Sequence, residues 1–188
     1  MLELLMLIIL VGVLVGYFLF LTDTILGSND LATSTRACEK IFDIIQAHAP
    51  FGAICYDLGC ARGFFAMSLQ KRIPHLRVYG IDNHRIRIIL AKIRGWVHQS
   101  PTVFMRGDFF AINLSEADVV YAYLLKELMP ELEKKLREEL KAGAVIITNT
   151  SFFPYWEPIE TIVTYPAEER FEKLFIYKKG EPHQALFS

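Results

Sequence analysis

The chain has 188 residues, which is enough for one domain of ordinary size, and apolar residues make up 53% of them. Its formal net charge of −1 argues against broad electrostatic capture of nucleic acid, so no nucleic-acid partner is expected. Cys38, Cys55 and Cys60 lack the C-x-x-C spacing of zinc and redox motifs, and the scattered histidines predict no metal site.

The N-terminal segment is strongly apolar, because residues 4–21 contain no charged side chain. As a helix it would cover roughly the thickness of the hydrocarbon core of a bilayer. The chain begins Met-Leu-Glu, without the basic region that precedes the apolar run of a signal peptide. We therefore expect residues 1–22 to be an uncleaved transmembrane anchor, with a cleaved signal peptide and a buried core helix as alternatives. The first basic residues, Arg36 and Lys40, follow this segment and favour a single-pass protein whose globular domain is cytoplasmic.

A polar, turn-rich linker is expected over residues 23–34, and one catalytic domain over residues 35–188. A first helix runs to about Ala47, with Ser34 or Thr35 as its cap. Apolar runs then alternate with amphipathic segments: strands are expected over 53–58, 77–82, 102–106, 117–123 and 144–150, and helices over 64–72, 84–95 and 131–140. This alternation predicts an α/β fold with a doubly wound, mostly parallel sheet.

The pattern changes after Thr150. Residues 159–165 and 171–178 read as two strands joined by a short Pro-Ala-Glu-Glu connection. Such a pair predicts a C-terminal antiparallel hairpin at the edge of the parallel sheet.

A glycine-rich loop follows the first expected strand. It reads Tyr56-Asp57-Leu58-Gly59-Cys60-Ala61-Arg62-Gly63. The glycines allow a sharp turn and a close approach of the backbone to a ligand. A carboxylate at Asp57 would repel the pyrophosphate of a dinucleotide, whereas it would attract the positive α-amino group of S-adenosyl-L-methionine. The loop therefore predicts S-adenosyl-L-methionine as the cofactor.

Two further acids follow the next two expected strands. Asp82 ends the second strand, where a carboxylate can accept hydrogen bonds from both ribose hydroxyls. Asp108 follows the third strand, where a carboxylate can accept one from the adenine amino group. The expected cofactor-binding residues are Asp57, Gly59, Cys60, Ala61, Gly63, Asp82, Asn83, Asp108 and Phe109.

One position of the loop departs from the usual D-x-G-x-G-x-G pattern. Ala61 stands where the middle glycine is expected, and Arg62 follows at a position that is often small or acidic. A Cβ atom resists the positive φ that a glycine would adopt there. This departure leaves open a degenerate module that binds the cofactor without turnover.

The segments 57–63, 80–83 and 107–110 resemble the motifs of class I methyltransferases, which use S-adenosyl-L-methionine. Residues 114–125, 129–136 and 152–158 are similar to the lysine methyltransferases that modify the c subunit of ATP synthase and the adenine nucleotide translocase, and to their prokaryotic relatives. The resemblance spans residues 35–178 and implies a Rossmann-like methyltransferase fold. It also implies an enzyme that methylates a protein lysine, with a membrane protein as one candidate substrate. A methyltransferase of a lipid-like or small apolar substrate is the alternative.

Candidate residues for contact with the methyl acceptor lie at the carboxyl ends of the fourth and fifth strands. They are Tyr121, Tyr123 and Asn149, and simple packing is the alternative for each. The aromatic segment 152–156 near the same edge could close the site, touch a membrane interface or pack against the domain. The helix 84–95 is basic, and we expect its Ile86, Ile89 and Ile93, with Trp96, to face the sheet.

Overall fold

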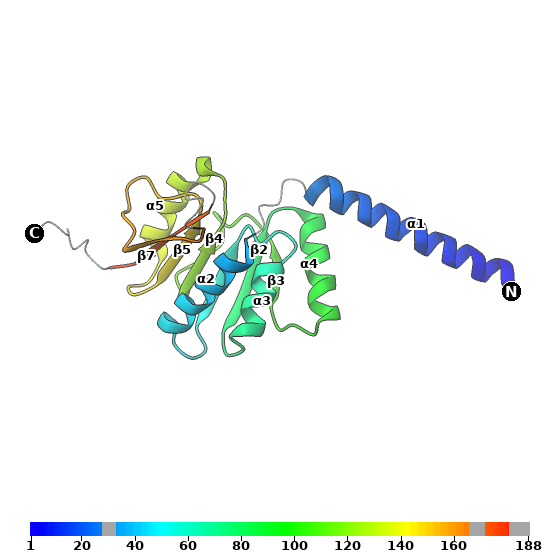
Figure 1. The fold of residues 1–188 in the computed structure, drawn as a ribbon, viewed down its shortest axis with the longest axis horizontal. Helices are drawn as coiled ribbons and strands as arrows, with labels where there is room; N and C mark the ends of the chain where they lie inside the picture. The colour runs from blue at the N-terminus through cyan, green and yellow to red at the C-terminus, as the bar shows by residue number, and fades with distance from the viewer. Residues whose placement is uncertain (28–32, 166–171, 181–188) are drawn as a thin grey trace, which may run out of the picture. The chain divides into compact units, whose positions relative to one another are not determined.

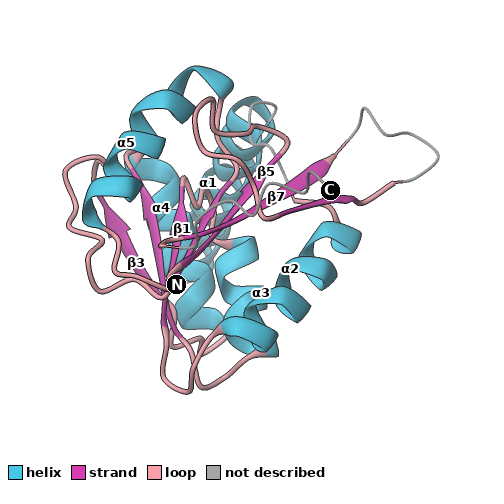
Figure 2. Cartoon of the chain, turned by 90° about the vertical axis from the view of Figure 1, so that its left-hand side faces the viewer, coloured by secondary structure: helices cyan, strands magenta, loops and turns pink. Residues whose placement is uncertain are grey.

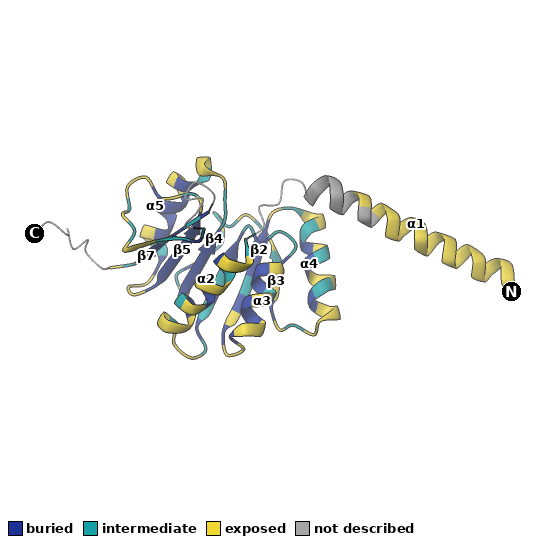
Figure 3. Ribbon diagram, viewed as in Figure 1, coloured by how far each residue is buried: buried dark blue, intermediate teal, exposed yellow. Residues whose placement is uncertain are grey.

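The computed structural model describes residues 1–27, 33–165 and 172–180, and the contacts divide the chain into two units, Met1–Ala32 and Thr33–Ser188. The first unit contains helix α1 (Leu2–Gly27), which extends beyond the expected end of the apolar segment at residue 22. The apolar side chains described along α1 are exposed (Figure 3). Residues 28–32 of the expected linker lie outside the described residues.

The prediction of a transmembrane anchor is wrong. Crossing the hydrocarbon core takes about 20 consecutive apolar residues in a helix. Among the residues that the structure describes, no helix is both long and apolar enough to pass through a membrane. The expected single-pass topology, the membrane location and the cytoplasmic placement of the globular domain are corrected accordingly.

The second unit is built on one seven-stranded sheet with the order β3-β2-β1-β4-β5-β7-β6 (Figure 1). The strands are β1 (Ile54–Leu58), β2 (Arg77–Asp82), β3 (Val103–Arg106), β4 (Val119–Ala122), β5 (Val145–Asn149), β6 (Glu160–Val163) and β7 (Lys173–Lys178). The first five run parallel, and β7 is antiparallel to both of its neighbours, β5 and β6. The predicted mixed sheet and its C-terminal antiparallel pair are confirmed; the expected Pro-Ala-Glu-Glu connection lies outside the described residues.

Helices cover both faces of the sheet (Figure 2). They are α2 (Thr35–His48), α3 (Phe64–Arg72), α4 (Arg85–Val97) and α5 (Met129–Glu139), the last preceded by a short 3-10 turn η1 (Lys126–Leu128). Ser34 caps α2 as expected, because its side-chain oxygen accepts a hydrogen bond from the backbone of Ala37 at 3.1 Å. Pro130 lies in the first turn of α5, where a missing N–H costs nothing.

Two apolar layers result. One lies between the sheet and helices α2 and α3, and the other between the sheet and α5. Every residue of β4 and β5 is buried, as expected for parallel strands covered on both faces (Figure 3). The carboxyl ends of the five parallel strands are thereby fixed at one edge, where ligands of such folds bind.

Helix α4 turns a different face to the sheet than the sequence predicted. Ile88, Ala91 and Gly95 are the buried residues of α4. The residues expected to face the sheet are exposed instead: Ile86 by 40%, Ile89 by 45%, Ile93 by 51% and Trp96 by 81%. The small residues face inward because the Phe104 ring occupies the space beneath α4, only 3.4 Å from where a Cβ of Gly95 would lie.

Candidate cofactor-binding site

The loop between β1 and α3 is a left-handed turn fixed to the end of β2. Gly59, Ala61 and Gly63 have φ values of 76°, 47° and 76°. The backbone N–H groups of Gly59 and Cys60 donate to the carbonyl oxygen of Ile81 at 2.8 and 3.0 Å. The Gly63 N–H donates to the Cys60 carbonyl at 2.8 Å, which closes the turn before α3 begins.

Ala61 adopts the conformation expected of the glycine that it replaces. A left-handed backbone costs an L-residue roughly 1–2 kcal/mol. The Ala61 N–H donates to Oδ2 of Asp82 at 3.0 Å, and this bond helps to hold the strained residue in place. The loop therefore keeps its turn in spite of the substitution, with some strain stored at this residue.

The two glycines are required for different reasons. A Cβ on Gly63 would lie 2.4 Å from Cζ of Phe104, so this glycine makes room for the core. A Cβ on Gly59 would lie 2.6 Å from Cδ2 of Leu124, a residue that follows β4. Gly59 thus lies beneath the loop of the next parallel strand, at the edge where the candidate site is expected.

Asp57 is a buried carboxylate with an unsatisfied oxygen. Its side chain is only 3% exposed, and within the described part of the chain its Oδ2 has no hydrogen-bond partner. Burial, and after it the negative charge of Asp82, raises the pKa of Asp57 to about 8, while a backbone hydrogen bond with Ala66 acts in the opposite direction. A buried, unpaired oxygen is costly. A ligand ammonium placed here would gain both a hydrogen bond and a charge partner.

Asp82 has a structural duty in addition to the expected one. Its Oδ1 accepts from the backbone N–H of His84 at 2.8 Å, and its Oδ2 accepts from Ala61. Nη1 of Arg87 lies 4.0 Å from Oδ2. Each carboxylate oxygen has a second lone pair, so the buried Asp82 can bind the loop and still accept from a ligand hydroxyl.

Asn83, Asp108 and Phe109 lie at the same edge, farther from the loop. The Gly107 N–H donates to the carbonyl of Asp82 at 3.1 Å, which brings the turn after β3 beside the end of β2. Asp108 is exposed, and its Oδ1 accepts from the backbone of Phe110 at 2.9 Å. Asn83 is exposed and Phe109 is partly buried. The structure thus brings the predicted residues to one edge in chain order.

Tyr121 and Asn149 meet in one hydrogen-bond network. Asn149 is fully buried, and its Nδ2 donates to the Tyr121 hydroxyl at 3.3 Å, while that hydroxyl lies 2.6 Å from Oγ1 of Thr33. Burial raises the pKa of Tyr121 well above its usual value, so it stays a neutral phenol. Tyr121 is also the register partner of Asp57 across β1 and β4. Tyr123 is only partly buried and packs against the apolar layer under α2 and α3.

The network contains a buried acid that the sequence did not reveal. Glu172 is 4% exposed and accepts from Nδ2 of Asn149 at 2.7 Å and from Oγ1 of Thr164 at 3.4 Å. It also accepts from the hydroxyl and the backbone N–H of Ser34. Glu172 precedes β7 and Ser34 caps α2, so no local pattern could have joined them. The one available signal was an acid flanking an apolar strand.

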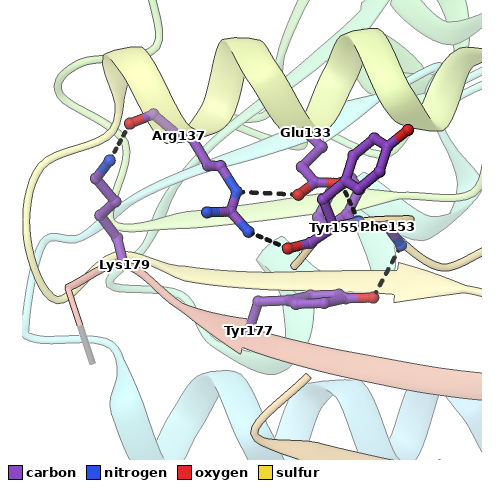
Figure 4. Close-up of polar contacts among 6 residues, drawn as sticks. All are labelled: Glu133, Arg137, Phe153, Tyr155, Tyr177 and Lys179. Carbon is purple, nitrogen blue, oxygen red and sulfur yellow. Dashed lines mark hydrogen bonds and ion pairs between the residues drawn. The ribbon is translucent and has the colours of Figure 1, made fainter. Parts of the chain in front are cut away.

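The aromatic segment 152–156 packs on the domain, which supports the packing alternative. Phe153 is 3% exposed, and its N–H donates to the hydroxyl of Tyr177 at 3.1 Å. The backbone of Tyr155 is held on both sides: its N–H donates to Glu133 at 2.9 Å, and its carbonyl accepts from Arg137 at 2.5 Å (Figure 4). An ion pair of 2.9 Å joins Glu133 to Arg137, so α5 fixes this segment.

Comparison with known proteins identifies relatives by sequence. The ANTKMT methyltransferase domain matches residues 57–160. A protein-lysine N-methyltransferase of Saccharolobus islandicus is 32% identical over 111 residues, which covers 58% of this chain and 69% of that protein. A lysine N-methyltransferase of the ATP synthase c-ring protein, from Rattus norvegicus, is 32% identical over 131 residues, which covers 68% of this chain and 58% of that protein.

A solved structure shares the fold. An RNA methyltransferase from Salinibacter ruber, in complex with S-adenosyl-L-homocysteine, superposes with a TM-score of 0.71 at 20% identity, covering 84% of this chain and 100% of that one. This likeness concerns the arrangement of the sheet and helices. The match over residues 57–160 and the identity to the Saccharolobus protein go further: the chain belongs to the ANTKMT methyltransferase domain family and is an S-adenosyl-L-methionine-dependent methyltransferase.

Proposed function

We propose that the chain transfers a methyl group from S-adenosyl-L-methionine to the side chain of a protein lysine. The buried, unsatisfied oxygen of Asp57 at the first strand–helix turn is the observation that carries the donor half of this proposal. The printed activities of the Saccharolobus and rat relatives support lysine as the acceptor.

The donor would be held by residues of three successive strand ends. Asp57 would bind the α-amino group, and the backbone of the loop from Gly59 to Gly63 would lie against the methionine portion, where a larger loop residue would leave no room. Asp82 would accept from the ribose hydroxyls with its remaining lone pairs. Asp108 and Phe109 would border the adenine. This order follows the strand ends β1, β2 and β3 along the sheet.

When bound, S-adenosyl-L-methionine supplies a methyl group on a positively charged sulfur, and methyl transfer from it is an in-line displacement. The acceptor amine must therefore arrive neutral, with little water around it. Tyr121 and Asn149 are buried, uncharged groups beside Asp57, and such surroundings favour the neutral form of a lysine amine. The half-buried Tyr123 is placed to line the approach to them.

The test is an incubation of the full chain with S-adenosyl-L-methionine labelled in the methyl group and a mixture of proteins, followed by acid hydrolysis. We expect the label in methylated lysine, with none transferred by Asp57→Asn. Label in lipids or small molecules would assign a different acceptor. Donor binding without any transfer would make the chain a binding module and contradict the proposal.

A further inference from the structure

Helix α4 carries a row of exposed apolar side chains. We call Ile86, Ile89, Ile93, Trp96 and Val97 the outer face of α4. Their exposed fractions are 40%, 45%, 51%, 81% and 60%. They recur at spacings of three and four residues, so they form one continuous stripe along a helix that advances about 100° per residue.

The stripe lies on the side of α4 opposite the sheet. Ile88, Ala91 and Gly95 face inward, about half a turn away from it. A surface helix normally has one apolar face, and a helix that is apolar on two faces is covered on both. Single exposed apolar residues are ordinary, but a contiguous patch of this kind marks an interaction site. The outer face therefore needs a partner.

The charge around the outer face defines the chemistry of that partner. Arg85 and Lys92 are exposed beside the stripe. The sequence has no aspartate or glutamate between Asp82 and Asp108, so no acid of this segment offsets these cations. An apolar stripe with basic flanks complements a surface that has apolar residues in its centre and carboxylates beside them.

The outer face is also connected to the cofactor edge. The first residue before α4, His84, donates its backbone N–H to Asp82, the acid that holds the glycine loop. On the other side, the neighbouring edge strand β3 leaves Val103 45% exposed. A protein bound along α4 would thus begin at the end of β2, next to the candidate site.

We propose that the outer face of α4 docks an amphipathic helix of the protein substrate, with acidic residues flanking its apolar stripe. Apolar residues at i, i+3 and i+7 are the spacing by which one helix packs against another. This inference rests on the proposed function, since it assigns the substrate a second contact outside the methyl-transfer site. That contact would strengthen binding of the substrate without changing the chemical step.

The probe is a synthetic peptide of about 18 residues, long enough to form a helix, with leucine on one face, glutamate on the other and a single terminal lysine. The control peptide has the same composition in scrambled order. Trp96 is 81% exposed, so its fluorescence reports docking without any turnover. We expect the amphipathic peptide to shift Trp96 emission to shorter wavelength, and Trp96→Phe to abolish the shift.

The variant that tests the apolar stripe is Ile89→Ser combined with Ile93→Ser. Both side chains already face solvent, so the fold should be retained. Its matched control is Phe51→Ser, because Phe51 is 89% exposed and precedes β1. We expect KM for the amphipathic peptide to rise about tenfold or more in the double variant, with kcat unchanged, and no rise in the control.

The variant that tests the charges is Lys92→Glu, with Lys134→Glu on α5 as its control, since both lysines are exposed. We expect Lys92→Glu to raise KM and Lys134→Glu to leave it unchanged. The scrambled peptide should be methylated equally by all of these proteins, and this keeps the basal reaction as an independent reference. If no peptide is methylated at all, the proposed function fails instead of this inference.

Four results would overturn the docking proposal. They are an absence of any Trp96 shift, an equal response to both peptides, a shift produced only by phosphatidylglycerol vesicles, and a shift caused by self-association of the chain. The third result would make the outer face a lipid contact, and the fourth would make it a contact between copies.

Discussion

Asp57 and Glu172 are two buried carboxylates at the same edge of the sheet, and they differ in how well they are satisfied. Glu172 accepts hydrogen bonds from Ser34, Asn149 and Thr164. Oδ2 of Asp57 has no partner in the described part of the chain. Buried polar groups are normally paired. The donor side of the site is therefore built for a missing ligand, and the acid on the acceptor side holds the fold together.

Replacing Asp57 with asparagine should have the largest effect. Asp57→Asn removes the negative charge that would pair with the donor's amino group, and we expect affinity for S-adenosyl-L-methionine to fall at least about 100-fold, since a buried charge partner is worth several kcal/mol. Calorimetric titration measures the change. Glu116→Gln, at an exposed acid of the same domain, is the control and should bind like the parent chain.

The same substitution should stabilise the protein without its ligand. With the pKa of Asp57 raised to about 8, the native state holds a proton between about pH 4 and 8 that the unfolded state has released. The unfolding free energy therefore falls as pH rises through this window, and Asp57→Asn should remove that fall. Denaturant unfolding at pH 5 and pH 8 decides it: an equal pH dependence in both proteins would contradict the account.

Glu172→Gln should produce the reverse pattern. The glutamine amide directs N–H groups toward Ser34 or Asn149, which already donate at this point, so we expect a loss of about 1–3 kcal/mol in unfolding free energy. Donor affinity should change by less than about twofold, because the two sites act independently. Urea unfolding and donor titration on the same protein separate the two effects. A large loss of donor binding would merge the two carboxylates into one site.

Ala61→Gly should have the smallest effect. The substitution relieves a positive φ of 47° at the centre of the loop, while the added flexibility of glycine in the unfolded state offsets part of the gain. We expect the unfolding free energy to rise by no more than about 1 kcal/mol and donor affinity to rise slightly. A clear loss of affinity in the titration would show that the methyl group of Ala61 contributes a contact.

Local sequence patterns predicted most of the fold because its strands are short apolar runs bounded by turns. The helix 64–72 and the strand 77–82 have the predicted bounds, and the loop between Asp57 and Gly63 turns where its glycines indicated. Asp57 could be selected because a carboxylate at that position suits a cationic ligand. Whether its oxygen is satisfied depends on packing, which the sequence does not contain.

The failures share one cause, which is a choice made by distant residues. Helix α4 has two apolar faces, and its periodicity alone could not decide which one the Phe104 ring would meet. Glu172 and Ser34 are 138 positions apart, and only the pairing of β7 with β5 brings them together. The apolar run of α1 was given too much weight, since no described helix is suited to cross a membrane.

The most direct test of the central claim is the number of protons released when S-adenosyl-L-methionine binds. It is measured by calorimetry at pH 6.5 in two buffers of different ionisation enthalpy. At this pH Asp57 is protonated in the free protein, and pairing with the ligand ammonium should force it to ionise. We predict release of about one proton by the parent chain and close to none by Asp57→Asn. Binding without proton release, or equal release by both proteins, would contradict the account.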